Sequence, residues 1–334
     1  MLRTIDLKFV RFKNNFVILL STLITKPPET FMTDKIPLSE TVSVWGISDI
    51  HVDYQENFDA LLDIPIPSVK RDALIIAGDA TDNISRLEEL LSAMKQRFRW
   101  VGFVPGNHEL WIREKNQGDA SFSTSIEKFD AIITMCQRID VFTEPKKIGT
   151  DTSQLWLVPL FSWYHGPEES TASLYAEKKG KQDRTHEMWS DFFLTQWPEW
   201  KEGFTADYFL QRNKFRVEQK YSYPVLSFSH FLPLQELLLP SIQEQKTSTL
   251  LHKDLTPEFN FSRVAGTTLI DDQLRKIDSQ MHLYGHQHRN RYRKINGVTY
   301  VSHCMGYPKE RKRGLIAEHC SQPKLLWDST NGFY

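Results

Sequence analysis

Seven side chains of metal-binding type stand in five short blocks of this 334-residue sequence. They are Asp49, His51, Asp79, Asn107, His230, His286 and His288. Imidazole nitrogens combined with carboxylate and amide oxygens suit Mn, Fe, Zn or a similar borderline ion. One tetrahedral ion needs only four ligands, so the set indicates two ions that share a bridging carboxylate.

Each block follows a short apolar segment that is typical of a buried strand. We expect strands at residues 42–50, 73–77, 101–104, 155–160, 225–229, 281–284 and 298–302. Because sites in α/β sheets collect in the loops beyond the carboxyl ends of the strands, the blocks can meet there. Gly78, Gly106 and Gly285 suit turns with positive φ or a close approach of the backbone to the ions.

Helical patterns lie between the strands, and this alternation predicts an α/β fold. Helices are expected at residues 85–98, 125–139 and 271–277, and Ser85 with Glu88 fits a capping box. Residues 165–222 break the alternation with many charged residues and tryptophans, which predicts a mostly helical insertion. The aromatic residues at 161–165 either pack this insertion or stack on a substrate, and packing is the preferred interpretation.

The composition excludes several classes of protein. With 40% hydrophobic and 25% charged residues, the chain is neither disordered nor collagen-like. The formal net charge of -1 does not favour a nucleic-acid partner. Three widely spaced cysteines form no disulfide framework, which favours a cytoplasmic location.

Residues 1–43 are expected to form an N-terminal extension, followed by the main domain at residues 44–328. The extension is basic and contains an apolar run at residues 16–24. A membrane span needs about 20 residues, so no stable membrane insertion is expected. The extension is either a targeting segment or a variable tail, and Met32 is an alternative to Met1 as the start.

In order, the blocks read D-x-H, G-D-x-x-D, G-N-H-E, a lone His and G-H-x-H. This order resembles the calcineurin-like metallophosphoesterases over roughly residues 43–303. The resemblance implies a four-layer αββα sandwich with two mixed β-sheets and a dimetal site on the loops at one edge. It also implies that Asp49, His51, Asp79 and His288 hold one ion, and that Asp79, Asn107, His230 and His286 hold the other.

The resemblance further implies a mechanism in which a metal-bridging hydroxide attacks phosphorus. His108 follows the ligand Asn107 and would stand beside the leaving oxygen, where it donates a proton or a hydrogen bond. Asp82 would fix the His108 ring. The alternatives are a structural role for His108 and a turn or helix N-terminal role for Asp82.

Two subfamilies are disfavoured by departures from their patterns. Protein Ser/Thr phosphatases carry arginines where this sequence has Asn83 and Pro105. Purple acid phosphatases differ at the positions of His51 and Asp82. The chain is therefore similar to an uncharacterised branch of the superfamily.

The sequence thus predicts a metal-dependent phosphoesterase that hydrolyses a phosphomonoester or a phosphodiester. The expected substrate is a small phosphate ester or a nucleotide. One alternative is a nucleotide pyrophosphohydrolase with the same site, and another is a scaffold or binding protein with a vestigial site. The sequence names neither the substrate, the metal pair, the protein partners nor the oligomeric state.

Overall fold

The computed structural model describes residues 41–64, 71–113, 121–180, 182–200, 203–240 and 256–334. The expected N-terminal extension therefore lies outside the described residues, apart from residues 41–43. In the described part of the chain, no helix combines the length and the apolar character needed to cross a membrane.

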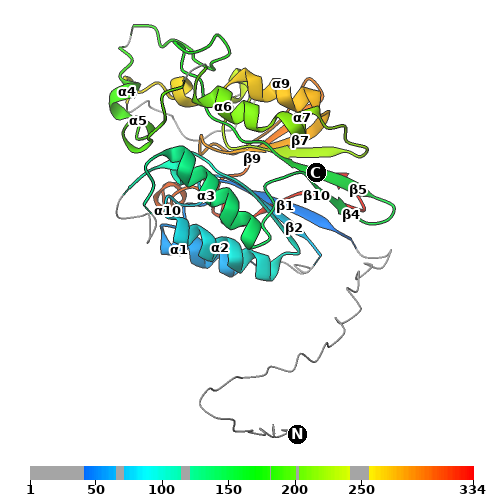
Figure 1. The fold of residues 1–334 in the computed structure, drawn as a ribbon. Helices are drawn as coiled ribbons and strands as arrows, with labels where there is room; N and C mark the ends of the chain where they lie inside the picture. Colours follow the sequence, from blue (N-terminus) through cyan, green and yellow to red (C-terminus); the bar gives the residue numbers. More distant parts are fainter. Residues whose placement is uncertain (1–40, 65–70, 114–120, 181, 201–202, 241–255) are drawn as a thin grey trace, which may run out of the picture. The chain divides into compact units, whose positions relative to one another are not determined.

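Two mixed sheets form the centre of the fold (Figure 1). The strands are β1 (Ser43–Ile47), β2 (Ala73–Ala77), β3 (Trp100–Val104), β4 (Lys146–Gly149), β5 (Gln154–Pro159), β6 (Val225–Phe228), β7 (Ser279–Tyr284), β8 (Arg291–Ile295), β9 (Val298–Ser302), β10 (Lys324–Asp328) and β11 (Gly332–Phe333). One sheet has the order β11-β10-β1-β2-β3, in which β1, β2 and β3 are parallel. The other has the order β4-β5-β6-β7-β9-β8, in which β5, β6, β7 and β9 are parallel.

Helices cover the outer faces of both sheets and complete a four-layer αββα sandwich, as the sequence predicts. The helices are α1 (Gln55–Leu62), α2 (Ile84–Arg97), α3 (Ser125–Arg138), α4 (Thr185–Met188), α5 (Asp191–Leu194), α6 (Thr205–Arg212), α7 (Lys214–Glu218), α9 (Thr268–Lys276) and α10 (Pro308–Lys312). Figure 1 shows α1, α2 and α3 beside the β1–β3 sheet and α6, α7 and α9 beside the other sheet.

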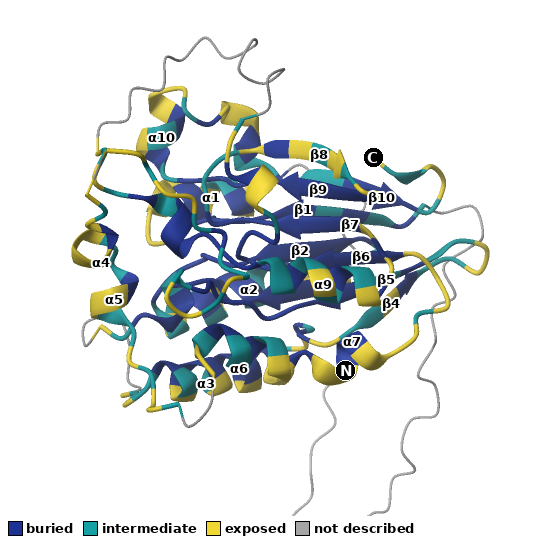
Figure 2. Cartoon of the chain, turned by 90° about the horizontal axis from the view of Figure 1, so that it is seen from above, coloured by how far each residue is buried: buried dark blue, intermediate teal, exposed yellow. Residues whose placement is uncertain are grey.

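Each sheet has an apolar cluster of its own beneath its helices. Leu87, Leu90 and Leu91 of α2 pack on β2 and β3, and Leu274 of α9 packs within the cluster of the second sheet. In Figure 2 the strands are largely buried, whereas the exposed residues lie on the outer sides of the helices. The sheets are therefore buried on both faces, which explains their continuous apolar sequences.

All seven expected strands are present, as β1, β2, β3, β5, β6, β7 and β9, and the three expected helices are α2, α3 and α9. The capping box at Ser85 is wrong, because the Asn83 side chain caps α2 by accepting from the Arg86 N–H at 2.9 Å. Four strands were not expected, namely β4, β8, β10 and β11. They lie at or next to sheet edges, where a strand needs less apolar sequence.

Residues 165–222 contain the four short helices α4, α5, α6 and α7, joined by irregular segments. The region is thus less helical than expected. Trp163 packs against Trp197 and Phe209, with ring centroids 4.9 and 6.2 Å apart. The packing interpretation of the aromatic residues is therefore confirmed for Trp163.

One buried histidine of the second sheet makes the folded chain sensitive to acid. His282 of β7 is fully buried, and its Nδ1 and Nε2 lie 2.8 and 3.1 Å from the hydroxyls of Ser227 and Ser229. Burial lowers the pKa of His282 to about 3. In the unfolded chain the His282 ring therefore takes up a proton near pH 6.5, whereas in the folded chain it stays neutral at this pH. The contribution of His282 to the free energy of unfolding is thus present above this pH and is lost below it.

We expect His282→Gln to reduce the acid sensitivity of folding. Between pH 8 and pH 5, His282 costs the native chain roughly 2 kcal/mol of its free energy of unfolding. The glutamine keeps polar contacts to the two serines and does not titrate. Urea unfolding at both pH values, in a buffer with chelator, measures the difference. An equal pH dependence in the native chain and the variant would contradict the assignment.

Candidate metal centre

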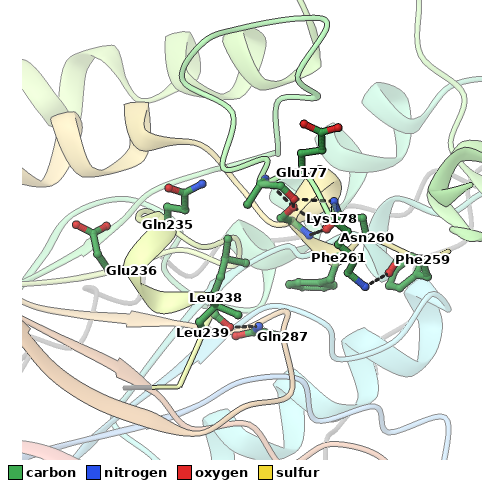
Figure 3. A pocket seen from close by; sticks show the side chains of 12 residues that line it. Glu177, Lys178, Gln235, Glu236, Leu238, Leu239, Phe259, Asn260, Phe261 and Gln287 are labelled. Atoms are coloured by element: carbon green, nitrogen blue, oxygen red, sulfur yellow. Dashed lines mark hydrogen bonds between the residues drawn. The ribbon is translucent and has the colours of Figure 1, made fainter. Parts of the chain in front are cut away.

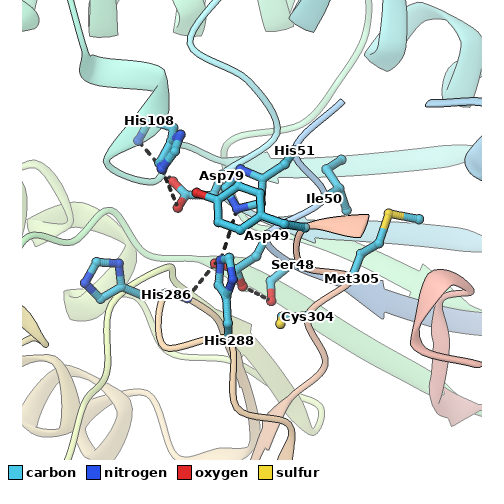
Figure 4. A network of polar contacts seen from close by, with 12 residues as sticks. Ser48, Asp49, Ile50, His51, Asp79, His108, His286, His288, Cys304 and Met305 are labelled. Carbon is cyan, nitrogen blue, oxygen red and sulfur yellow. Dashed lines mark hydrogen bonds and ion pairs between the residues drawn. The ribbon is translucent and has the colours of Figure 1, made fainter. Parts of the chain in front are cut away.

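The five blocks converge at the carboxyl ends of β1, β2, β3, β6 and β7, so both sheets contribute to one site. Six of the seven expected ligands are buried, and the side chain of His288 is 13% exposed. Figure 4 shows the side chains of Asp49, Asp79, His286 and His288 close together, with His51 and His108 beside them.

A first group of donors consists of Asp49, His51 and His288, whose ligand atoms lie within 4.8 Å of one another. The Nε2 atoms of His51 and His288 are 3.0 Å apart. His288 Nε2 is also 3.5 Å from Asp49 Oδ1. These are three of the four residues expected to hold the first ion.

A second group consists of Asp79, His230 and His286, again with ligand atoms within 4.8 Å of one another. Asn107 belongs to this group, because its Oδ1 lies 3.2 Å from His230 Nε2 and 3.1 Å from His286 Nδ1. The four residues are those expected around the second ion.

Asp79 connects the two groups. Its Oδ2 lies 3.3 Å from His230 Nε2, and its ligand atom also lies within 4.8 Å of His51 and His108. Among the expected ligands it therefore has the position that a bridging carboxylate requires.

Three of the four imidazoles have the orientation that metal ligation requires, with one nitrogen held by the protein and the other turned inward. His230 Nδ1 lies 2.9 Å from the Ala77 carbonyl, and His286 Nε2 lies 2.9 Å from the Val264 carbonyl. His288 Nδ1 lies 2.7 Å from Glu310 Oε2. The inward nitrogens then face one another or an acceptor oxygen, so the residues fit two cations.

Burial sets the charge state of most of these groups. It raises the pKa of Asp49 and lowers the pKa of His51 and His286 well below its usual value. Burial opposes the charged form of His230 as well, but Asp79 raises the pKa of His230 to about 9. A neutral imidazole is the form that binds metal, and bound cations would remove the cost of the buried carboxylates.

The backbone of the centre is strained at the ligands. Five of the seven expected ligands have positive φ, which is uncommon for residues other than glycine; they are Asp49, His51, Asp79, His286 and His288. Gly78 also has a positive φ of 79°, and a Cβ at Gly106 would lie 2.3 Å from Asp79 Oδ1. The expected need for glycine is thus confirmed at these two positions.

Glu109 holds the loops after β2 and β3 together. Its buried carboxylate accepts from the backbone N–H groups of Asp79, Ala80, Thr81 and Gly106 at 2.6–3.0 Å. Four hydrogen bonds to one side chain fix the turn that carries Asp79. The sequence contains this residue in the G-N-H-E block, but no role was predicted for it.

Asp191 orients the amide of Asn107 from within the inserted region. Asp191 Oδ1 accepts from Asn107 Nδ2 at 2.9 Å and from Trp111 Nε1 at 2.6 Å. Its Oδ2 accepts from Trp189 Nε1 at 2.6 Å. Because the Asn107 nitrogen donates outward to Asp191, its oxygen faces His230 and His286.

His108 lies at the edge of the centre, where its side chain is 15% exposed. Its Nε2 is 3.8 Å from Asp79 Oδ2, and its ring lies 3.7 Å from that of Trp111. Burial lowers the pKa of His108 to about 4, although Asp79 and Asp82 act in the opposite direction. The Asp82 carboxylate lies 3.1 Å from Arg113 Nε.

Three further residues of the site were not predicted, namely Glu310, Tyr307 and Asp191. Tyr307 stacks on His51 with ring centroids 4.3 Å apart. Tyr307 precedes α10 and Glu310 lies in its first turn, both outside every block, and Asp191 lies in the insertion. The contacts of these residues with the ligands become apparent only in the folded structure, so a single sequence could not have identified them.

Comparison with known proteins identifies the family. The family model described as calcineurin-like phosphoesterase matches residues 42–290. The chain belongs to the calcineurin-like phosphoesterase family. It is a hydrolase, and as a metal-dependent phosphoesterase it acts on phosphate esters, as the sequence predicts. Members of the family use divalent metals, in agreement with the two donor groups.

The relatives of this calcineurin-like phosphoesterase include a protein of Mycobacterium tuberculosis. The chain is 27% identical over 293 residues to the acyl-carrier-protein phosphodiesterase PptH, with 84% of each chain covered. It is also similar to the crystal structure of the phosphopantetheinyl hydrolase PptH of that organism, with a TM-score of 0.64 and 23% identity. That similarity covers 85% of this chain and 95% of the other, and it shows a common fold.

We expect Asp191→Ala to weaken binding of one metal ion. The substitution leaves three donors without their acceptor and frees the Asn107 amide to rotate. Loss of such an orienting contact costs about 10- to 100-fold in metal affinity. A metal titration monitored by native mass spectrometry, on the variant and on the unsubstituted protein, measures the affinities for the first and the second ion.

The control is Asp130→Asn, which removes an exposed carboxylate that pairs with Arg212 at 3.3 Å. It should leave both metal affinities unchanged, since an exposed ion pair contributes little to structure. Tight binding of two ions by Asp191→Ala would show that Asp191 does not orient Asn107.

Proposed function

We propose that this phosphoesterase is a phosphodiesterase that releases phosphopantetheine from a serine of an acyl carrier protein. One observation carries the proposal. The similarity to the acyl-carrier-protein phosphodiesterase PptH extends over 84% of both chains, and every expected metal donor lies within residues 42–290, which the family model matches. The substrate is then a diester attached to a protein, rather than the small ester or nucleotide expected from sequence.

The proposed metal ligands divide as the donor groups do. Asp49, His51 and His288 would hold one ion, Asn107, His230 and His286 would hold the other, and Asp79 would be shared between them. The donor types favour Mn, Fe or Zn. When bound, the two cations supply an activated water and neutralise the charge of the phosphate oxygens.

In the proposed reaction, the oxygen of water forms a bond to phosphorus, and the bond from phosphorus to the serine oxygen breaks. The products are the free serine hydroxyl and phosphopantetheine, so one water is consumed. His108 Nε2 stands beside the leaving serine oxygen and donates a hydrogen bond or a proton to it. Burial lowers the pKa of His108 and the charge of Asp82 opposes this effect, so the proposed role of Asp82 is electrostatic.

Two alternatives use the same residues. A pyrophosphohydrolase would cleave a phosphoanhydride with the same donors, and a scaffold would need none of them. The presence of the complete donor set together with His108 supports an enzyme. We also propose a cytoplasmic location, which the three free cysteines support.

We expect the metal-loaded protein to convert holo-acyl carrier protein into the apo form. His108→Ala should lower kcat by about 10²- to 10⁴-fold, because a positioned proton donor contributes that much. Asp79→Asn should abolish turnover through loss of the bridging charge. Mass spectrometry of the carrier protein follows the loss of the phosphopantetheine group after Mn, Fe or Zn is added to metal-stripped enzyme.

The matched control is His319→Ala, because His319 is an exposed histidine outside the site. It should have native activity. Hydrolysis of bis-p-nitrophenyl phosphate without any cleavage of holo-carrier protein would contradict the proposed substrate and retain the phosphoesterase.

A further inference from the structure

A second and larger cavity adjoins the metal centre. The cavity at the centre has a volume of about 200 Å³ and is lined by Asp79, His108 and Tyr307, among others. The neighbouring cavity, here named the side cavity, has a volume of about 650 Å³ and is shown in Figure 3. Phe261 and Gln287 line both of them.

The residues shared by the two cavities connect them directly to the metal ligands. Gln287 stands between the expected ligands His286 and His288 in the sequence. The ring of Phe261 lies 5.2 Å from the ring of His286. A substituent of a phosphate ester at the centre would therefore reach the side cavity by passing Phe261.

The side cavity is lined by four segments of the chain, at residues 176–178, 235–239 and 259–262 and at Gln287, and hydrogen bonds join these segments. Asn260 Nδ2 donates to the carbonyl of Ala176 at 2.8 Å, and Gln235 Nε2 donates to the carbonyl of Tyr175 at 3.2 Å. Gln287 Nε2 donates to the carbonyl of Leu238 at 2.8 Å. These bonds preform the cavity, as is usual for small-molecule sites.

Arginines of β8 support the wall from behind. Arg291 donates to Gln287 Oε1 at 2.7 Å and to the Leu238 carbonyl at 3.4 Å. Arg293 donates to the Leu239 carbonyl at 2.7 Å. In these contacts the guanidinium groups bind the wall segment rather than a ligand in the cavity.

The chemistry of the lining selects a neutral ligand. Its surface includes the apolar side chains of Ala176, Leu238 and Leu239 and the rings of two phenylalanines. Among the described residues of the lining, the charged side chains are those of Glu177, Lys178 and Glu236, so carboxylates outnumber ammonium groups there. A second phosphate or a nucleotide would meet carboxylates there, whereas an alkyl chain with amide groups would meet a compatible surface.

We infer that the side cavity binds the pantetheine arm of the substrate while the phosphate lies at the metal centre. This inference rests on the proposed function, and it names the part of the substrate that the cavity recognises. The arm is a neutral chain that carries methyl groups and amides, and its volume suits a cavity of this size. The carrier-protein serine is the leaving group on the side of His108, and the arm stays on the phosphate.

The test fills the cavity and compares two substrates. Ala176 is exposed, and only its backbone takes part in the hydrogen bonds to Asn260 and Ser262. Ala176→Trp therefore keeps these bonds and occupies the cavity. We expect the kcat/KM for holo-carrier protein to fall about tenfold more than that for bis-p-nitrophenyl phosphate, which has no arm. Leu239→Asp, at a residue that is 72% exposed, should act in the same direction.

Calorimetry with pantetheine, which lacks the phosphate, tests the cavity without any turnover. Pantetheine should bind to the metal-loaded native protein, and binding should weaken in Ala176→Trp. The matched control is Ala317→Trp, at an exposed alanine outside both linings, and it should change neither substrate ratio nor binding.

The outcomes separate this inference from the proposed function. If holo-carrier protein is cleaved but Ala176→Trp alters neither the ratio nor pantetheine binding, the cavity assignment is wrong and the proposed function stands. If holo-carrier protein is not cleaved but pantetheine binds and Ala176→Trp weakens it, the assignment stands and the proposed function fails. Cleavage of coenzyme A alone would support the cavity and identify coenzyme A as the source of the arm.

Discussion

The site depends on one buried carboxylate that is not itself an expected metal ligand. Glu109 accepts four backbone N–H groups from the loops that follow β2 and β3, and it thereby fixes the turn of Asp79. Asp79 has a positive φ of 54°, a conformation that an isolated loop would leave. Because Asp79 contacts both donor groups, this one set of hydrogen bonds fixes the ligand that the two groups share.

The other ligands are held by contacts from outside the centre. One ring nitrogen of His230 and one of His286 contact a backbone carbonyl, and one ring nitrogen of His288 contacts the Glu310 carboxylate. Asp191 turns the Asn107 oxygen inward. The contacts fix the tautomers of these three imidazoles and the direction of the Asn107 oxygen, so these four ligands need little reorganisation when cations bind. The folded chain carries the cost of buried charge and backbone strain at this site, and bound metal would compensate for it.

The sequence contained much of the fold and of the centre. The apolar segments at β2, β3 and β9 predict strands because both faces of each sheet are buried, and the polar blocks that follow them mark the ligands. The strands at or next to the sheet edges were not predicted, because such a strand is not buried on both faces and needs no continuous apolar sequence. The charged residues of β8 are an example. Asp191 and Glu310 escaped for another reason. They act on ligands that are distant in the sequence, by 84 and 22 residues respectively, and no local pattern encodes such a contact.

The most direct test of a dinuclear centre is anomalous diffraction from crystals of the protein loaded with Mn. Two peaks about 3.5–4 Å apart are expected, with Asp79 between them. One should lie against Asp49, His51 and His288, and the other against Asn107, His230 and His286. A single peak, or no peak at these residues, would contradict the central claim that the strained loops of both sheets are arranged to bind a pair of cations.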